Sequence, residues 1–263
     1  MASHHTHVAT GLLTGTLIAT TLNLGSAGTA LFALSSGGAA LLADVDTPDS
    51  AISHAGGWIL AFPFWALRKM TVKHRGLSHT LLAVLVVSSG VFLTGYFFTT
   101  SKGWLPAHWP TRILIPALLA MLATRSVLTF GSGKRGVGEN RTFHTIISRR
   151  HRFYIDALVG LTIVYLGISL GNSPHFTYTL TLAVGIGYLT HLVIDAIFNG
   201  VPMFWPFPPS LQPTHRFTLG HFRTGGLFDH VLGWSSLLLT IALFLSAAFP
   251  SWHVSHLLHL INL

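Results

Sequence analysis

The stretch GYLTHLVIDAIFNGVPMFWPF, Gly187 to Phe207, decides the fold that we predict for this chain. Its first half is an apolar run in which His191 and Asp195 stand four residues apart, so a helix places both on one face, about one turn apart. Unpaired polar groups of this kind are costly inside a membrane. The glycine and prolines that follow end the helix. The pattern therefore predicts a membrane helix that delivers two ligands to a common ion near its end.

The composition is typical of a membrane protein. Half of the 263 residues are hydrophobic and only 8% are charged, and the mean hydropathy is positive. The chain has no cysteine, which excludes disulfides, thiolate metal sites and cysteine nucleophiles and leaves histidine and carboxylate as metal ligands. In so apolar a chain, the excess of Lys and Arg indicates membrane topology more than a nucleic-acid site.

The distribution of apolar residues predicts an all-α fold, a polytopic membrane helical bundle with about 5–7 membrane segments. We expect one domain over residues 1–263. The first two segments are expected to form a short helix pair or a re-entrant hairpin at the N-terminus. The apolar segments lie at about 8–24, 28–43, 80–100, 113–130, 156–171, 178–198 and 230–249.

Basic residues gather in three connections, at 68–75, 134–152 and 216–223. Seven crossings that start from a cytoplasmic N-terminus place all three connections in the cytoplasm, as the positive-inside rule requires. The second connection is expected to be a basic cytoplasmic loop at about 131–155. The same topology brings the N-terminal histidines, the acidic residues after position 43 and the end of the helix with Asp195 to that membrane boundary. A site facing the cytoplasm is therefore predicted.

The first candidate ligands lie in HHTHVATG, residues 4–11, and LLADVDTPDS, residues 41–50. His7 is a candidate metal ligand, ahead of the two histidines before it. Asp44 and Asp46 are alternate carboxylates in a turn, where both can face one cation, and a carboxylate that bridges two metals is common in hydrolytic sites. We take Asp46 as the candidate bridging ligand. Asp44 or Asp49 would orient or deprotonate the water, although Asp49 also suits the role of a helix cap.

A second group lies in KHRGLSHTLL, residues 73–82. His74 and His79 are five residues apart, which does not align them on one helix, but Gly76 permits a turn that brings them together. Arg75 can bind a phosphate or carboxylate oxygen in bidentate fashion, or it can serve as a positive-inside anchor. Ser78 is expected to cap the helix that follows.

The ordered motifs THVATG, LLADVD, HRGLSHTLL and GYLTHLVIDAIFNGVPMFWPF resemble the YdjM-like family, described as LexA-binding, inner-membrane-associated metal-dependent hydrolases. The family usually has proline where Ala43 stands, a change that leaves both carboxylates, and often has glutamate near Asp229, so no role is carried over there. The resemblance implies a multi-pass protein of the bacterial inner membrane with a divalent-metal site. By motif position its ligands are His7, Asp44, Asp46, His74, His79, His191 and Asp195.

These features predict a membrane-bound hydrolase with one or two divalent ions, zinc or manganese. Water activated by the metal would attack a phosphoester or related bond, and Arg75 would hold the anionic group and stabilise charge on the leaving oxygens. The H-x-x-x-D helix also looks like the ligand helices of zinc-dependent phospholipase C and P1-type nucleases, which favours phosphoesters. A site at the membrane boundary suits a lipid or lipid-linked substrate.

Two other classes stay open. A transporter or an ion- or proton-binding protein would use the same histidines and aspartates to carry a metal or relay protons. A membrane regulatory protein without catalysis would recruit a partner through the basic loop, and deletion of residues 134–152 would abolish that function while leaving metal content alone. The expected partners are membrane lipid and substrate rather than nucleic acid, and the sequence names no protein partner.

Overall fold

The computed structural model describes residues 3–46, 77–98, 108–128, 149–169, 175–198, 200–204 and 216–248. Within these residues the only β-pairing is a single antiparallel bridge between Val201 and Phe217. Everything else of regular structure is helical, so the all-α prediction is confirmed. The α-helices are α1 (His4–Thr21), α2 (Gly25–Ala39), α5 (Leu81–Phe97), α6 (Ile115–Leu128), α7 (Arg149–Ser169), α8 (His175–Phe198) and α9 (Leu227–Ala248).

Each apolar segment of the sequence corresponds to one of these helices. Four helical stretches within the described residues are long and apolar enough to cross a membrane: Gly25–Val45, Pro110–Leu128, His175–Phe198 and Leu227–Ser246. Two shorter apolar helices, Leu81–Phe97 and Ala157–Leu166, accompany them. The polytopic membrane bundle is therefore confirmed. One boundary differs from the prediction, because α7 already begins at Arg149, so the last part of the basic loop expected at about 131–155 is helical.

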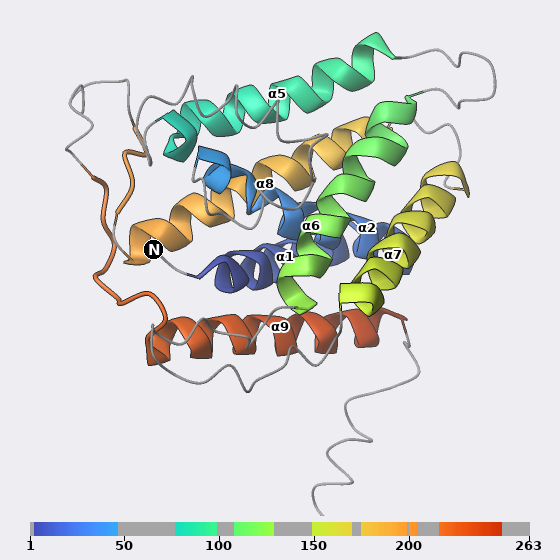
Figure 1. Cartoon of the computed structure of the whole chain (residues 1–263). Helices are drawn as coiled ribbons and strands as arrows, with labels where there is room; N and C mark the ends of the chain where they lie inside the picture. Colours follow the sequence, from blue (N-terminus) through green and yellow to red (C-terminus); the bar gives the residue numbers. More distant parts are fainter. Residues whose placement is uncertain are drawn as a thin grey trace, which may run out of the picture.

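The hairpin of α1 and α2 forms the centre of the bundle (Figure 1). Helix α1 packs against α2, α8 and α9, and α2 packs against α6 and α8, while α5 covers α8 and α7 covers α6. Contact between α2 and its neighbours is close because glycines stand there. A Cβ atom on Gly187 of α8 would overlap the carbonyl oxygen of Ser36, and one on Gly38 would overlap that of Leu119. Small residues permit this approach of helices in membranes.

Five helix ends meet at one end of the bundle, on the left in Figure 1: the starts of α1, α5 and α9 and the ends of α2 and α8. The short 3₁₀ turns η1 (Leu42–Asp46) and η2 (Leu77–His79) extend α2 and precede α5 at this end. We call it the N-terminal end. Polar residues that are more than a hundred positions apart in sequence therefore become neighbours.

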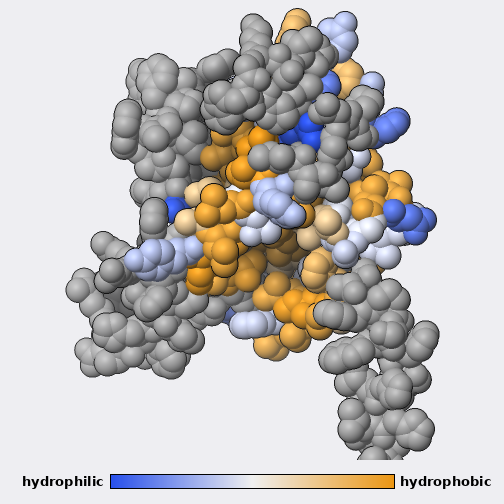
Figure 2. Space-filling view, turned by 90° about the vertical axis from the view of Figure 1, so that its right-hand side faces the viewer, coloured by the Kyte–Doolittle hydropathy of each residue, from blue (hydrophilic) through white to orange (hydrophobic). Residues whose placement is uncertain are grey.

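Large apolar side chains cover the outside of the bundle. Leu85 on α5, Leu161 on α7 and Leu238 on α9 are 64%, 67% and 61% exposed. Figure 2, which views the bundle from the side opposite the N-terminal end, shows apolar side chains over much of the described surface. Such a surface suits contact with lipid tails and not with water.

Candidate metal centre

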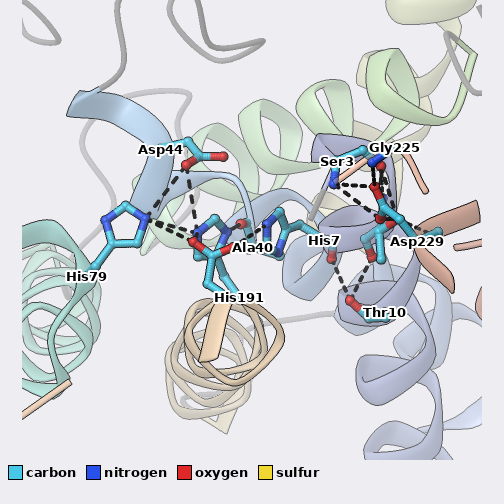
Figure 3. Close-up of polar contacts among 11 residues, drawn as sticks. Ser3, His7, Thr10, Ala40, Asp44, His79, His191, Gly225 and Asp229 are labelled. Carbon is cyan, nitrogen blue, oxygen red and sulfur yellow. Dashed lines mark hydrogen bonds and ion pairs between the residues drawn. The ribbon is translucent and has the colours of Figure 1, made fainter. Parts of the chain in front are cut away.

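At the N-terminal end, five side chains from four elements converge in the interior of the protein, and Figure 3 labels His7, Asp44, His79 and His191 among them. They are His7 on α1, Asp44 in η1, His79 in η2, and His191 and Asp195 on α8. Four of them are 0% exposed and Asp44 is 9% exposed. Buried charged groups are retained only where they pair or bind a cation. The spacing of His191 and Asp195 predicted that they share one face of α8. The side chains of His7, Asp44 and His79 lie against that face.

The nitrogens of two histidines lie close to each other and to two carboxylate oxygens. The Nε2 atoms of His79 and His191 lie 3.3 Å apart. Oδ1 of Asp44 lies 3.7 Å from His79 Nε2 and 3.8 Å from His191 Nε2. Oδ2 of Asp195 lies 3.6 Å and 3.7 Å from the same two nitrogens. Each oxygen therefore forms a triangle with the two nitrogens.

The size of each triangle fits a divalent metal. A triangle with such sides has its centre about 1.9–2.2 Å from each corner, and zinc binds histidine nitrogen and carboxylate oxygen at about 2.0–2.2 Å. Hydrogen bonds and ion pairs alone do not require two imidazole nitrogens to face each other while both also face two carboxylates. The donor set and its spacing therefore pass the test for a metal site.

His7 approaches from the other side of Asp195. Its Nε2 lies 3.2 Å from Oδ1 of Asp195, and its ring stacks on that of His191 with 3.8 Å between the ring centroids. Nδ1 of His7 is buried and makes no hydrogen bond with any described residue. Among the described residues, two groups can hold an ion: His7 with His191 and Asp195, and Asp44 with His79 and His191. Asp195 thus lies between His7 and the pair formed by His79 and His191.

The backbone fixes the tautomer of His191. Its Nδ1 lies 2.6 Å from the carbonyl oxygen of Ala40. A carbonyl oxygen only accepts, so Nδ1 carries the proton and donates it. In the neutral ring, Nε2 then presents a lone pair on the side of His79 and the two carboxylates. This neutral form is the one that binds metals.

His79 is held by a short chain of polar groups. Oγ of Ser78 lies 3.0 Å from His79 Nδ1, and the hydroxyl of Tyr188 donates to the carbonyl oxygen of Ser78 at 2.6 Å. The prediction that Ser78 caps the next helix is wrong, because Thr80 caps α5 and accepts from the backbone N–H of Ala83 at 3.1 Å. The sequence reasoning missed Tyr188, although its position three residues before His191 places both on one helix face.

Several predicted site residues cannot be placed. His74, Arg75 and Asp49 lie outside the described residues, and only the backbone of Asp46 is described. Their roles stay predictions.

Asp229 connects two helices at this end of the bundle. It is 1% exposed, and its carboxylate accepts hydrogen bonds from the backbone N–H of Ser3 at 3.0 Å, the hydroxyl of Thr6 and the backbone N–H of Gly225 at 2.8 Å. These bonds tie the start of α1 to the start of α9 (Figure 3). Asp229 therefore stabilises the helix that carries His7.

His4 and His5 lie outside both groups that can hold an ion. Burial, together with the neighbouring His5 and His7, lowers the pKa of His4 to about 4. Burial also lowers the pKa of His5, whose Nδ1 lies 2.9 Å from the carbonyl oxygen of Ser126. Both rings are therefore neutral at neutral pH, and His5 joins the start of α1 to the end of α6.

Comparison with known proteins adds a family relationship. The model of the family described as "YdjM inner membrane protein" matches residues 1–261, nearly the whole chain. No curated protein and no solved structure matches.

Proposed function

The chain belongs to the YdjM inner membrane protein family, and from this premise we propose that it is a membrane-bound metal-dependent hydrolase. The observation that carries the proposal is a pair of imidazole nitrogens 3.3 Å apart, each of which lies 3.6 to 3.8 Å from two carboxylate oxygens. The family resemblance adds the reaction class, hydrolysis.

His79, His191 and Asp195 would hold the ion, zinc or manganese, and Asp44 would face the position left open for water. A divalent metal in such a site lowers the pKa of water and polarises the oxygen of a scissile bond. His7 would orient Asp195 through its contact with Oδ1, and the carbonyl of Ala40 would keep His191 in the tautomer that binds. A second ion would take Nε2 of His7 and Oδ1 of Asp195.

Asp44 is proposed as the general base. Its side chain is 12% exposed whereas that of His79 is 0% exposed, so water reaches the centre most easily from the side of Asp44. Oδ1 of Asp44 would take the proton of the attacking water. The proposals for Asp46 as a bridging ligand, for Asp49 beside the water, for His74 as a further ligand and for Arg75 as the anion clamp rest on the sequence.

The substrate side of the proposal follows from position. The centre lies at the ends of apolar helices, so a phosphoester on a lipid or lipid-linked molecule reaches it from the membrane boundary. We propose that this boundary is the cytoplasmic one of a bacterial inner membrane, because Arg216 and Arg223 lie at the same end and basic residues favour that side.

The test compares detergent-purified wild type with His191→Ala, Asp44→Asn and the control His175→Ala, an exposed histidine. Metal content and hydrolysis of bis(p-nitrophenyl) phosphate are measured. We expect His191→Ala to lose both, and Asp44→Asn to keep the metal while hydrolysis falls by about 10²–10⁴-fold. If His191→Ala retains the metal, the proposed metal site is wrong. If the wild-type protein binds metal but hydrolyses no phosphoester, the proposed hydrolase activity is wrong.

One observation favours a second candidate, a metal transporter. His7, His79, His191 and Asp195 are 0% exposed, and a metal site without an open position for substrate is usually not catalytic. Wild-type protein in vesicles that moves zinc or manganese across the bilayer, with no hydrolysis, would favour transport.

A further inference from the structure

The segment that enters α9, residues 216–228, combines cations with exposed apolar side chains. It reads RFTLGHFRTGGLF, and Arg216, His221 and Arg223 are exposed. Leu219, Phe222 and Leu227 are 60%, 41% and 81% exposed. We call it the boundary segment. Water can solvate the cationic side chains but not the apolar ones, and an ionic partner can pair with the cations but does not cover the apolar side chains.

The position of the boundary segment is set by the two helices that it connects. It lies between the candidate membrane spans His175–Phe198 and Leu227–Ser246, and Figure 1 shows it at the N-terminal end of the bundle. A connection between the ends of two spans lies at the surface of the membrane. Aromatic, leucine and arginine side chains are the usual composition of such interfacial segments.

The boundary segment is also fixed to the helix that carries Asp195. The N–H of Leu219 donates to the carbonyl oxygen of Ala196 at 2.7 Å, and Phe217 and Val201 exchange hydrogen bonds of 2.8 and 3.0 Å. Phe222 stacks on Phe228 with 4.0 Å between ring centroids. These contacts hold the exposed side chains beside the candidate centre.

The charge of the boundary segment is not balanced by the described protein. Arg216 and Arg223 form no salt bridge with any described residue. The ion pairs between described residues all join histidines to aspartates of the candidate centre. The chain has only seven acids, and Asp44, Asp195 and Asp229 are buried. Negative charge for the two arginines therefore comes from outside the described chain.

We propose that the boundary segment binds anionic phospholipid headgroups, with Arg216 and Arg223 on the phosphates and the leucine and phenylalanine side chains among the upper acyl carbons. A nucleic acid or a soluble anion would satisfy the arginines and leave the apolar side chains in water. An anionic lipid satisfies both. The proposal needs no metal, so its failure would leave the proposed function untouched.

The absence of cysteine makes a local test possible. Thr224→Cys places a single thiol on an exposed position of the boundary segment, where a fluorophore is attached. The labelled protein is reconstituted in phosphatidylcholine vesicles that contain increasing fractions of phosphatidylglycerol with brominated, quenching acyl chains. Brominated phosphatidylcholine serves as the lipid control. Arg216→Gln and Arg223→Gln, alone and together, are compared with Arg149→Gln/Arg150→Gln, which removes the same charge from the start of α7.

We expect half-maximal quenching at a lower fraction of phosphatidylglycerol than of phosphatidylcholine. Each substitution in the boundary segment should raise that fraction about fivefold, the equivalent of about 1 kcal/mol for one basic residue at an anionic surface. The α7 variant should behave as wild type, and metal content should be unchanged in all variants. Equal quenching by both lipids, or equal loss in both sets of variants, would overturn the proposal. Displacement of the lipid by inorganic phosphate, but not by chloride at equal ionic strength, would show a soluble-anion site instead.

Discussion

His79 and His191, the two histidines whose Nε2 atoms face each other, are held by different kinds of group. The carbonyl of Ala40 only accepts, so it fixes the tautomer of His191 as well as its ring position. The hydroxyl of Ser78 donates or accepts, so it leaves the tautomer of His79 free to suit its partner. Tyr188 acts on His79 through the backbone of Ser78. It is therefore a positioning residue.

Tyr188→Phe removes the hydroxyl and keeps the buried ring. The carbonyl of Ser78 then loses its donor, and the turn that presents His79 is less well fixed. We expect metal affinity to fall about 10-fold, because groups that orient ligands typically change affinity by 10–100-fold. A titration against a competing chelator measures this, with Tyr178→Phe, whose side chain is 59% exposed, as the control. Equal affinity in wild type and Tyr188→Phe would show that Tyr188 only fills space.

At the scale of elements, α1 depends on α9 for its position. The carboxylate of Asp229 accepts hydrogen bonds from Ser3, Thr6 and Gly225, and Ser3 is also the N-cap of α1. His7 lies one turn further along α1. The position of His7 beside Asp195 therefore depends partly on a hydrogen-bond network whose residues all lie outside the candidate metal centre.

Asp229→Ala should lower the free energy of unfolding by about 1–3 kcal/mol, because it leaves the buried hydroxyl of Thr6 and the backbone N–H groups of Ser3 and Gly225 without their acceptor. Thermal unfolding in detergent measures the change. Ser235→Ala removes an exposed hydroxyl from the same helix and should have little effect. If Asp229→Ala unfolds at the wild-type temperature, water or another group replaces the carboxylate.

The contact between α8 and α2 brings His191 to the carbonyl of Ala40. Gly187→Ala puts a methyl group against the carbonyl oxygen of Ser36, which is backbone and moves only with its helix. We expect a loss of about 1–3 kcal/mol in stability together with weaker metal binding. Gly160→Ala is the matched control, since a Cβ there meets nothing within 4 Å. If both variants match wild type in stability and metal content, the helices are not closely packed at this point.

At the scale of the whole molecule, the candidate centre joins segments from residue 7 to residue 195. A metal bound there holds α1, η1, η2 and α8 together at once, and the unfolded chain cannot bind it in the same way. Metal binding is therefore coupled to the stability of the bundle.

Added zinc or manganese should raise the unfolding temperature of wild-type protein that has been treated with chelator. At a concentration of 100 times Kd, the stabilisation is about 2.7 kcal/mol. His79→Ala and His191→Ala should show no rise, and His175→Ala should behave as wild type. Calorimetry in detergent measures the shift. A rise of equal size in His191→Ala would place the binding elsewhere.

The sequence by itself determined the helices and much of the candidate ligand set. Each of the seven apolar segments became a helix, because apolar composition and helix-ending residues act locally. The i, i+4 spacing alone placed His191 and Asp195 on one face. The distribution of Lys and Arg predicted that the start of α1 and the ends of α2 and α8 lie at the same end of the bundle, since membrane topology depends on the charge of each connection.

Only the tertiary structure decided which atoms meet. It placed Asp195 between His7 and the other two histidines, gave the cap of α5 to Thr80 instead of Ser78, and assigned Asp229 to the start of α1. These outcomes depend on distances between helices, which close contacts such as that of Gly187 with Ser36 set. Periodicity along the chain carries no information about such distances, because it records the face of each helix and not the partner against which that face packs.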